Sequence, residues 1–486
     1  MQEIELKFQI PPDKRESILK ALQRKSVQHT RIQSLYFDNK QFELFQHYIL
    51  LKQHLENEQW LQILKIASTR HTEQSEIKEL LSSNENQIQV EHYQKNKHIP
   101  KEIRTLISDL ADPLRLQFST NFERSSTLFN FQNSQIIVEL DHGLMQVNQD
   151  QFEIYELRFK LKQGTIQDLI SFILPRVKRY SLWLDIRSHV QQGFQYAQDM
   201  HEIPVQQQIP LHLNKNDSTE QALKKVIHHC LQHLLPNSTA IASQRFNSEH
   251  VHQARVAIRR LRSALKTFSS WSQHIDLTWQ NELVNLFREL GTSRDLSMFY
   301  EELLPQLEAL DAPKFKLETL PQHENNKPSD AFKSLNFASL VLSLIQFIHQ
   351  DIHEQPSKSI EKSIHKKLEK LHQAIQSDAE NYLSLDVEAR HRTRKCLKRL
   401  RYSIEFISSL YDQPSVKTYL KALKPAQESL GKYNDLIVAE NLLKPYVTTQ
   451  SKVWFALGWI AAEKQNALIQ SQQDLLHFAQ VKTFWK

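Results

Sequence analysis

Glycine and cysteine are scarce in this chain of 486 residues, and it has no long hydrophobic run. With only 6 glycines, the chain lacks the glycine-rich loops that cradle nucleotide phosphates, which excludes a P-loop NTPase and a dinucleotide-binding turn. Its 2 cysteines, Cys230 and Cys396, are too few for a disulfide framework or a zinc site, which fits a reducing cytosol. The most apolar stretch, 338–348, is too short to cross a bilayer, so we expect no membrane contact.

The chain is long enough that a single hydrophobic core is unusual, and two domains are expected. The first residues, MQEIELKF, carry acids where a secretion signal needs basic residues before an apolar run, so we expect no export and a cytoplasmic location. Prolines and glutamines between the two halves mark a linker. We therefore place a first domain at 1–200, a linker at 201–217 and a second domain at 218–486.

Apolar and polar residues alternate in several short runs of the first domain, at 3–8, 136–141 and 155–162. This period of two predicts β-strands. The polar positions of these strands are charged in each run. Their charged face therefore either meets solvent or lines a cavity for an ionic ligand.

The second domain has helical periodicity and an internal repeat. The run HQARVAIRRLR at 252–262 is answered by HRTRKCLKRLR at 391–401. Glycine-containing turn elements follow the two runs at nearly the same spacing, LGTSRD at 290–295 and LGKYND at 430–435. Two markers in the same order predict a duplication, and hence two related helical bundles.

Each basic run forms one stripe on its predicted helix, beside an apolar stripe that can pack into a bundle. Neighbouring like charges on a helix repel each other by a few tenths of a kcal/mol per pair, and neither stripe contains an acid. A solvated surface is the alternative, but a duplicated stripe favours an anion that supplies the missing charge. Tyr402 is the one aromatic residue beside the stripes, which favours a bare phosphate chain over RNA, because RNA binding usually uses stacking rings.

The duplicated basic pattern resembles the CHAD family of helical domains, which are associated with inorganic polyphosphate, over roughly 216–486. The resemblance implies that the anion groove is lined by His252, Arg255, Arg259, Arg262, Lys266, His391, Arg394, Lys398 and Arg401.

The opening run Glu3-Ile4-Glu5-Leu6-Lys7 resembles the E-x-E-x-K signature of the CYTH family of triphosphate-tunnel proteins, and the similarity extends over about 1–200. It implies an eight-stranded antiparallel β-barrel, so the fold class is α+β, with the barrel followed by an all-α domain of two duplicated bundles. Phosphate-binding roles are implied for Lys7, Lys52, Lys65, Arg124, Arg158, Lys160 and Lys162. Catalytic roles are implied for Glu3 and Glu5, which with Glu139, Asp141 and Glu156 would hold Mg²⁺ or Mn²⁺.

The chain departs from the catalytic CYTH pattern at three places, of which the first is the strand expected as L-R-x-R, where Lys52 and His54 stand. Where an E-x-E-x-E-x-K strand is typical, Glu156 is followed by Arg158, Lys160 and Lys162, so two acids have become bases. Where S-K-x-x-R-G-Y is typical, 188–194 reads SHVQQGF, without that Lys and Arg. We therefore expect a barrel that binds tripolyphosphate or a polyphosphate end but hydrolyses it slowly or not at all, because a missing metal-holding carboxylate raises the barrier.

Three functional hypotheses remain open at this point. The first is a binder of polyphosphate or tripolyphosphate with weakened, metal-dependent triphosphatase activity, present in the cytoplasm or on polyphosphate granules. A fully active Mg²⁺-dependent inorganic triphosphatase is the second; CYTH followed by CHAD is a familiar bacterial arrangement that includes such enzymes. The third is an RNA- or ribosome-associated protein that uses the same basic helices.

Overall fold

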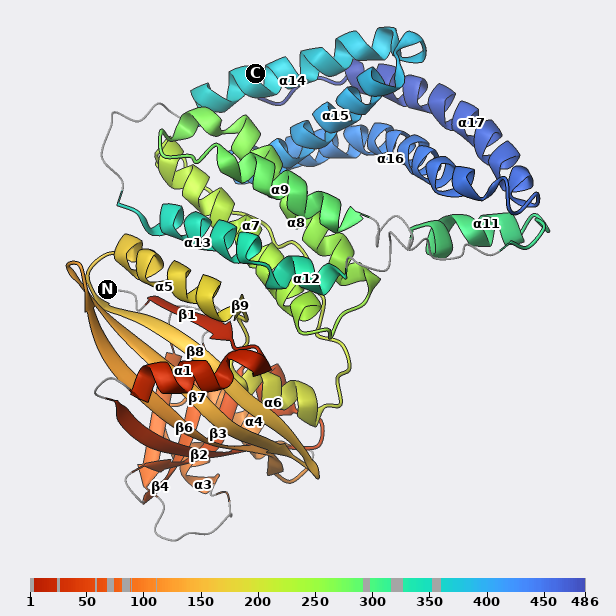
Figure 1. Ribbon diagram of the computed structural model, residues 1–486. Helices are drawn as coiled ribbons and strands as arrows, with labels where there is room; N and C mark the ends of the chain where they lie inside the picture. The colour runs from red at the N-terminus through yellow and green to blue at the C-terminus, as the bar shows by residue number, and fades with distance from the viewer. Residues whose placement is uncertain are drawn as a thin grey trace. The chain divides into compact units, whose positions relative to one another are not determined.

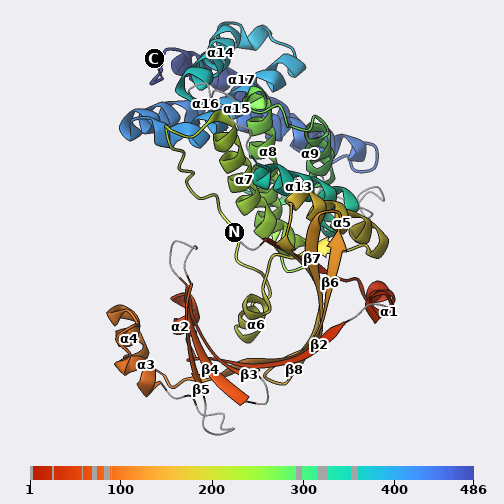
Figure 2. The ribbon, with the colours of Figure 1, turned by 90° about the vertical axis from the view of Figure 1, so that its left-hand side faces the viewer.

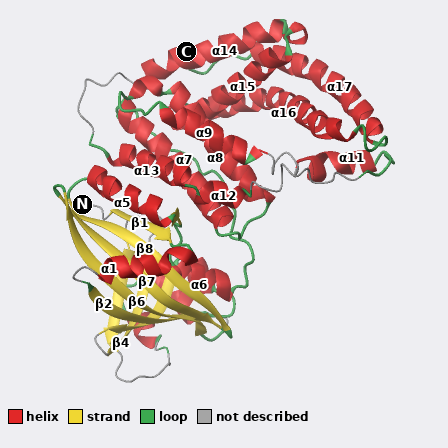
Figure 3. Cartoon of the chain, in the orientation of Figure 1, coloured by secondary structure: helices red, strands yellow, loops and turns green. Residues whose placement is uncertain are grey.

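A computed structural model describes residues 4–23, 27–56, 59–67, 74–80, 88, 90–110, 112–291, 298–315, 327–351 and 360–485. The chain divides into two compact units, Met1–Ile203 and Pro204–Lys486. Over the described residues, the strands belong to the first unit and the second unit is helical (Figures 1 and 3). The predicted α+β class, with an antiparallel β domain followed by an all-α domain, is confirmed.

The first unit is built on one antiparallel sheet with the order β5-β4-β3-β2-β6-β7-β8-β1-β9. Its strands are β1 (Ile4–Gln9), β2 (Gln28–Asp38), β3 (Ile49–Glu56), β4 (Gln59–Ala67), β5 (Gln74–Leu80), β6 (Arg115–Phe131), β7 (Ser134–Val147), β8 (Asp150–Gln163) and β9 (Trp183–Leu184). The sheet bends strongly (Figure 2). An eight-stranded closed barrel was expected, but this sheet has nine strands, and its edge strands β5 and β9 do not pair over the part of the chain described. Since β1 already pairs with β8 on one side and β9 on the other, it offers no free edge for closure.

Helices cover both faces of this sheet. They are α1 (Arg15–Gln23), α2 (Glu43–Gln46), α3 (Glu91–Lys95), α4 (Lys101–Ser108), α5 (Ile166–Tyr180) and α6 (His189–Ala197). Helix α5 packs on β7 and β8, where Phe172 meets Phe159 at 6.2 Å between ring centroids. Helix α6 packs on β6 and β7, inside the bend of the sheet (Figure 2), where Phe194 contacts Phe118. The predicted alternation therefore buries one strand face under α5 and turns the charged face toward α6.

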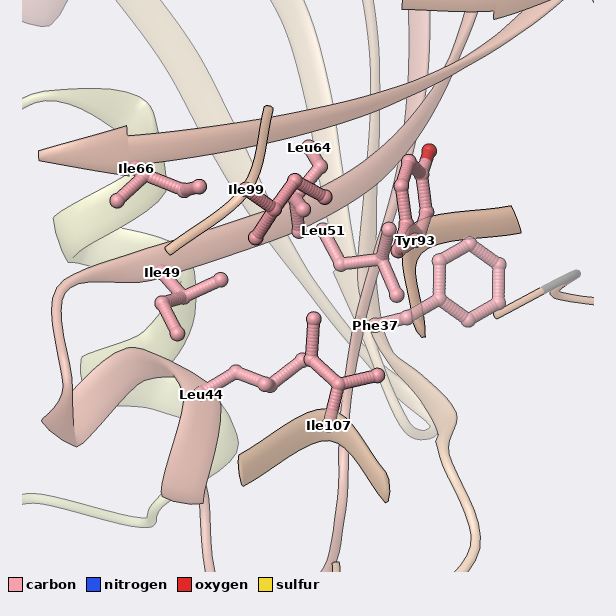
Figure 4. Close-up of a cluster of buried hydrophobic side chains, with 9 residues drawn as sticks. All are labelled: Phe37, Leu44, Ile49, Leu51, Leu64, Ile66, Tyr93, Ile99 and Ile107. Atoms are coloured by element: carbon pink, nitrogen blue, oxygen red, sulfur yellow. The ribbon is translucent and has the colours of Figure 1, made fainter. Parts of the chain in front are cut away.

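A separate apolar cluster fills the region around β2, β3 and β4 (Figure 4). It consists of Phe37, Leu44, Ile49, Leu51, Leu64, Ile66, Tyr93, Ile99 and Ile107. Helices α2, α3 and α4 supply Leu44, Tyr93 and Ile107 to it. Each buried side chain of this size contributes roughly 1.5–3 kcal/mol of transfer free energy, so the cluster anchors this arm of the sheet without using charged groups.

The second unit contains helices alone over its described residues, beginning with α7 (Thr219–Ala242), α8 (Ser248–Thr267) and α9 (Thr278–Glu289). Further along are α11 (Leu304–Glu308), α12 (Pro328–Lys333), α13 (Leu335–His349), α14 (Ile360–Glu380), α15 (Val387–Ile407), α16 (Gln413–Leu443) and α17 (Val453–Ala479).

The predicted duplication is visible in these elements. Helices α8 and α15 each carry one basic run, and the run begins at the same distance from the start of its helix in both. A short 3₁₀ helix follows each of them, Ser269–Trp271 after α8 and Ser408–Leu410 after α15. The sequence placed Gly431 in a turn, which is wrong, because it lies inside α16.

None of the helices in the described ranges combines the length and the apolar character needed to cross a membrane. The repeated helices instead pack into bundles within the second unit, where α8 contacts both α7 and α15. This contact brings the two basic runs of the sequence together.

Candidate functional site

The first candidate site is a charged cluster on the face of the sheet that meets α6. Register explains why these side chains meet: Glu5 lies opposite Lys160 and Lys7 opposite Arg158 on the β1–β8 pair. On the next pairs, Glu139 lies opposite Arg158, and Asp141 lies between Glu156 and Arg124. Three of these cross-strand pairs join an acid to a base, Glu5 with Lys160, Glu139 with Arg158 and Asp141 with Arg124, which lets opposite charges meet.

Asp141 and Glu139 are the buried centre of this cluster. Arg124 donates to Asp141 in a bidentate pair, from Nε to Oδ1 at 2.8 Å and from Nη2 to Oδ2 at 3.0 Å. Arg158 also donates to Asp141 and lies 3.6 Å from Glu139. Lys160 bridges Glu139 at 3.3 Å and Glu5 at 3.4 Å. Burial opposes the charge on Arg124, but the hydrogen bond and charge of Asp141 outweigh it and raise the pKa of Arg124.

Glu156 forms a second centre with a different set of partners. Its Oε1 accepts hydrogen bonds from Lys7 at 3.4 Å, Gln9 at 3.0 Å and Gln192 at 3.1 Å, and its Oε2 lies 2.8 Å from Nε2 of His189. Burial alone would raise the pKa of Glu156, but His189, Lys7 and Arg158 together lower it to about 2. This carboxylate is therefore ionised at all ordinary pH values and is saturated by protein donors.

His189 and Gln192 are functional neighbours that sequence reasoning missed, because they were noted only as losses of Lys and Arg. Both lie in the first turn of α6, which begins at a capping box between Ser188 and Gln191. That cap fixes the start of the helix and so presents both side chains to Glu156. The signal was available in the sequence, since imidazole and amide groups can replace the missing cations as hydrogen-bond donors.

The carboxylates expected to bind a metal do not fit a divalent ion as the site is arranged. Glu5, Glu139 and Asp141 are paired with Arg124, Arg158 and Lys160, and Glu156 is saturated. In the ranges that the structure describes, no three His, Cys, Asp or Glu residues form a group that could hold a metal ion. Glu3, the other predicted ligand, lies outside the described residues. The cluster contains as many bases as acids: the acids are Glu5, Glu139, Asp141 and Glu156, and the bases are Lys7, Arg124, Arg158 and Lys160. It therefore has no excess negative charge that would attract a cation.

The other predicted phosphate-binding lysines of the sheet lie away from this cluster. Lys52 is on β3 opposite Tyr36, and Lys65 is on β4 opposite Leu50. Strands β2, β6 and β7 separate them from β8 in the sheet order. Lys162 lies near the exposed end of β8. Their proposed roles therefore remain predictions.

The second candidate site is a cavity of about 310 Å³ between α8, α9 and α15. Its lining consists of Arg259, Arg262, Ser263 and Lys266 from α8, Gln280 and Phe287 from α9, and His391, Arg394, Lys395, Lys398 and Arg399 from α15. Seven of these side chains are lysine or arginine, and none of the eleven is an acid. We call this space the cationic cavity.

Over the described residues, no ion pair neutralises the lysines and arginines that line the cationic cavity. Among the described residues, the buried Nε–H groups of Arg259, Arg262 and Arg394 find no acceptor. Burial, followed by the charges of Arg259 and Arg394, lowers the pKa of Lys398 to about 6, although Asp435 acts in the opposite direction. Buried donors without partners are costly in a folded protein, so an anion that supplied acceptors would stabilise this arrangement.

Burial and neighbouring cations also lower the pKa of three further basic groups of the cationic cavity, Lys266, Lys395 and His391. The charge of Arg399, followed by burial, lowers the pKa of Lys266, and burial with the charge of Arg262 lowers the pKa of Lys395. For His391, burial and neighbouring cations outweigh its hydrogen bond with Asn434 and lower its pKa. Neighbouring cations therefore act on each of these three groups.

Six of the nine predicted groove residues line the cationic cavity: Arg259, Arg262, Lys266, His391, Arg394 and Lys398. The other three lie elsewhere. Arg255 donates to the carbonyl of Leu290 at 2.8 Å, Arg401 donates to Glu405 at 2.7 Å, and His252 lies near enough to His233 to affect its pKa. Lys395 and Arg399 line the cavity but fall outside the predicted stripe, although they lie four and eight residues after His391 and so share its helix face.

Phe287 is the aromatic residue of the cavity lining, and its ring is already used. The guanidinium of Arg255 lies 4.4 Å from the ring centroid, and those of Arg259 and Arg262 lie 5.8 Å from it. These cation–π contacts hold the arginines in place. A ring covered by guanidinium groups is a poor platform for stacking a nucleic acid base.

Two protein-family models match different parts of the chain. The model of the CYTH domain matches residues 1–170, and the model of the CHAD domain matches residues 225–444. An inorganic triphosphatase of Haemophilus influenzae is 32% identical over 77 residues, which is 16% of this chain and 22% of that protein. The match thus spans about a fifth of the relative. CYTH triphosphatases are generally metal-dependent.

Several solved structures each resemble part of the chain. The CHAD domain from the plant Ricinus communis is 28% identical, with a TM-score of 0.46, and the similarity covers 55% of this chain and 95% of that one. PptA from Streptomyces chartreusis is 17% identical, with a TM-score of 0.39, over 53% of this chain and 99% of that one. HpAC1 from Hippeastrum, described as having a dominant triphosphatase activity, is 14% identical, with a TM-score of 0.28, over 40% of this chain and 96% of that one. The chain is a two-domain protein in which a CYTH domain is followed by a CHAD domain.

Proposed function

We propose that this protein binds inorganic phosphate chains in the cationic cavity of its helical unit. The observation that carries the proposal is the group of seven lysines and arginines around one cavity, with no acid among the described residues of its lining. An anion with closely spaced charges would supply acceptors to the Nε–H groups of Arg259, Arg262 and Arg394 and would relieve the repulsion between them. A linear phosphate chain meets both needs, because every unit carries charge and several acceptor oxygens.

The sheet has a different role in this proposal. Arg158 and Lys160 hold Glu5, Glu139 and Asp141 in ion pairs, so the acids that would hold a metal are occupied by bases. The charged face therefore binds a tripolyphosphate or chain end weakly and hydrolyses it slowly. Phosphoryl transfer depends on positioning and charge stabilisation, and an internally neutralised cluster supplies little of either to an incoming polyanion.

Titration of the full chain with a polyphosphate of defined length, at several salt concentrations, tests the binding proposal. If all seven cations of the cavity contact phosphates, the logarithm of the affinity falls with the logarithm of the salt concentration with a slope of about −5. A single-stranded RNA at equal phosphate concentration serves as competitor. Failure to bind polyphosphate, or its displacement by that RNA, contradicts the proposal.

A fully active, metal-dependent triphosphatase is the second candidate. It is favoured by the similarity to the Haemophilus influenzae inorganic triphosphatase and by the presence of Glu5, Glu139, Asp141 and Glu156 on one sheet face. Release of phosphate from tripolyphosphate, measured with Mg²⁺, with Mn²⁺ and with a chelator, separates the two candidates. Rapid turnover that requires the metal establishes the second candidate and rejects slow hydrolysis.

A further inference from the structure

The two basic helices carry equivalent residues, but their charges are compensated differently. When the two basic runs are aligned at His252 and His391, Arg259 corresponds to Lys398, Arg260 to Arg399, and Arg262 to Arg401. The correspondence continues to the next helical turn, where Lys266 on α8 corresponds to Glu405 on α15. At this one position the side chain is positively charged on α8 and negatively charged on α15.

Glu405 neutralises two arginines on its side of the contact between α8 and α15. Its Oε1 accepts from Nε of Arg401 at 2.7 Å, and its Oε2 accepts from Nη1 of Arg260. Arg260 is 1% exposed, so this pair is buried on the arginine side. Gln208 adds a further acceptor to Arg260 at 2.6 Å.

Lys266 is in the equivalent place on the other side, and there no acid of the described chain pairs with the same two arginine positions. Arg262 is the counterpart of Arg401, and its buried Nε–H finds no acceptor in the described chain. Arg399 is the counterpart of Arg260, and its charge is the largest influence that lowers the pKa of Lys266. One exchange of charge between the repeats therefore decides whether two arginines are compensated by the protein.

We propose that the contact between α8 and α15 carries two equivalent anion sites, of which one is occupied by the carboxylate of Glu405 and the other is left open by Lys266. This inference rests on the proposed function in that phosphate is the anion of the open site. The carboxylate of Glu405 takes the place of a phosphate group between Arg260 and Arg401. The carboxylate of Glu405 therefore confines the bound phosphate chain to the open site, which is formed by Arg262, Lys266 and Arg399. The difference between Lys266 and Glu405 thus determines where the chain binds.

Substitution of Lys266 tests the open site. Lys266→Glu places a carboxylate where Glu405 stands in the other repeat, so it pairs with Arg262 and Arg399, whereas Lys266→Gln only removes a charge. We expect K266E to bind polyphosphate at least about tenfold more weakly than K266Q, because two further arginines become occupied. We also expect a salt slope shallower than the wild type by about 2 units for K266E and by about 0.7 for K266Q. Equal affinities and slopes for the two variants overturn the inference.

Glu405→Gln tests the occupied site. Without the carboxylate, Arg260 and Arg401 become available to phosphate, so the salt slope of the full chain steepens by about 1 unit. A slope that is unchanged or shallower contradicts the inference.

A measurement without ligand separates this inference from the proposed function. With no polyphosphate present, K266E unfolds at a temperature at least about 2 °C higher than K266Q, because the new carboxylate compensates Arg262 and Arg399. If wild type fails to bind polyphosphate while K266E is the more stable variant, the proposed function fails and the equivalence of the two sites stands. Equal or lower stability of K266E rejects the equivalence, whatever the wild type binds.

Discussion

The charged face of the sheet and the cationic cavity contain similar residue types but treat them in opposite ways. On the sheet, Arg124, Arg158 and Lys160 each have a carboxylate partner at 3.3 Å or less. In the cavity, the seven lysines and arginines have no ion-pair partner over the described residues; they are Arg259, Arg262, Lys266, Arg394, Lys395, Lys398 and Arg399. The number of cations alone therefore does not indicate an anion site.

This difference shows in the ionisation of the two regions. Acids and bases on the sheet stabilise each other's charged forms, as the lowered pKa of Glu156 and the raised pKa of Arg124 indicate. In the cavity, burial and like charges lower the pKa of Lys398, Arg394 and Arg262. A cluster that is already neutral gains little from a polyanion, whereas a cluster of buried like charges gains much.

Charge reversal at the centre of the cavity should give the largest effect. Arg259→Glu with Lys398→Glu removes two contacts and adds two repulsive charges, so we expect polyphosphate affinity to fall about 100-fold or more. Titration at fixed salt measures it. Lys417→Glu with Lys421→Glu makes the same charge change at exposed positions of α16 that do not line the cavity. A similar loss in this control would mean that net charge, rather than the cavity, determines binding.

Making the sheet resemble a metal site should give the next largest effect. Arg158→Glu with Lys160→Glu restores the acids expected in catalytic CYTH strands, and we expect Mg²⁺-dependent release of phosphate from tripolyphosphate to rise at least about tenfold. The crowded acids should also lower the melting temperature without metal, and Mg²⁺ should restore it. The variant with Gln at both positions removes the bases without adding acids. If that variant is equally active, or if Mg²⁺ has no effect, Arg158 and Lys160 do not limit hydrolysis.

A change of pH should alter the affinity of the cavity for polyphosphate without altering the charged cluster of the sheet. Lys398 has a pKa of about 6 in the free protein, lowered first by burial, and a bound polyanion raises it, so binding takes up a proton near neutral pH. Polyphosphate affinity should therefore be highest below pH 6. As the pH rises from there toward the pKa of Lys398 in the complex, affinity should fall by at most about tenfold per pH unit on account of this group. Arg259, Arg394 and Arg401 face this lysine as cations and Asp435 as an anion.

Titrations between pH 6 and pH 9 in buffers of different ionisation enthalpy measure this proton uptake. Lys398→Arg keeps the charge and should flatten the pH dependence, while affinity at pH 8 rises. A pH dependence that is the same in wild type and in this variant would assign the proton to another group.

The smallest effect is expected where a basic residue is already paired. Arg401 is satisfied by Glu405 and by Gln427 at 2.7 Å, so Arg401→Gln should change polyphosphate affinity less than about twofold. The equivalent substitution on α8, Arg262→Gln, removes an unpaired donor of the cavity and should weaken binding several-fold. Equal losses from both variants would remove the distinction between paired and unpaired positions.

Much of the fold could be predicted from sequence, because it depends on short-range periodicity. The alternation around Leu6 and Phe8 predicted a strand, and the repeated runs at 252 and 391 predicted a duplicated helical domain. The open sheet was not predictable, since β9, with two residues, is too short to give a period-two signal. The position of Gly431 inside a helix was missed for a related reason: glycine ends many helices but does not end all of them.

The sequence by itself determined which residues are charged, on which face of a strand or helix they lie, and that the basic helix occurs twice. Only the tertiary structure decided which of those charges are compensated. Arg260 meets Glu405 from another helix, and His189 on α6 meets Glu156 on β8, at distances where Coulomb energy is large. Because that energy depends on separation in space, whereas sequence patterns report separation along the chain, a paired arginine and an unpaired one look the same until the chain is folded.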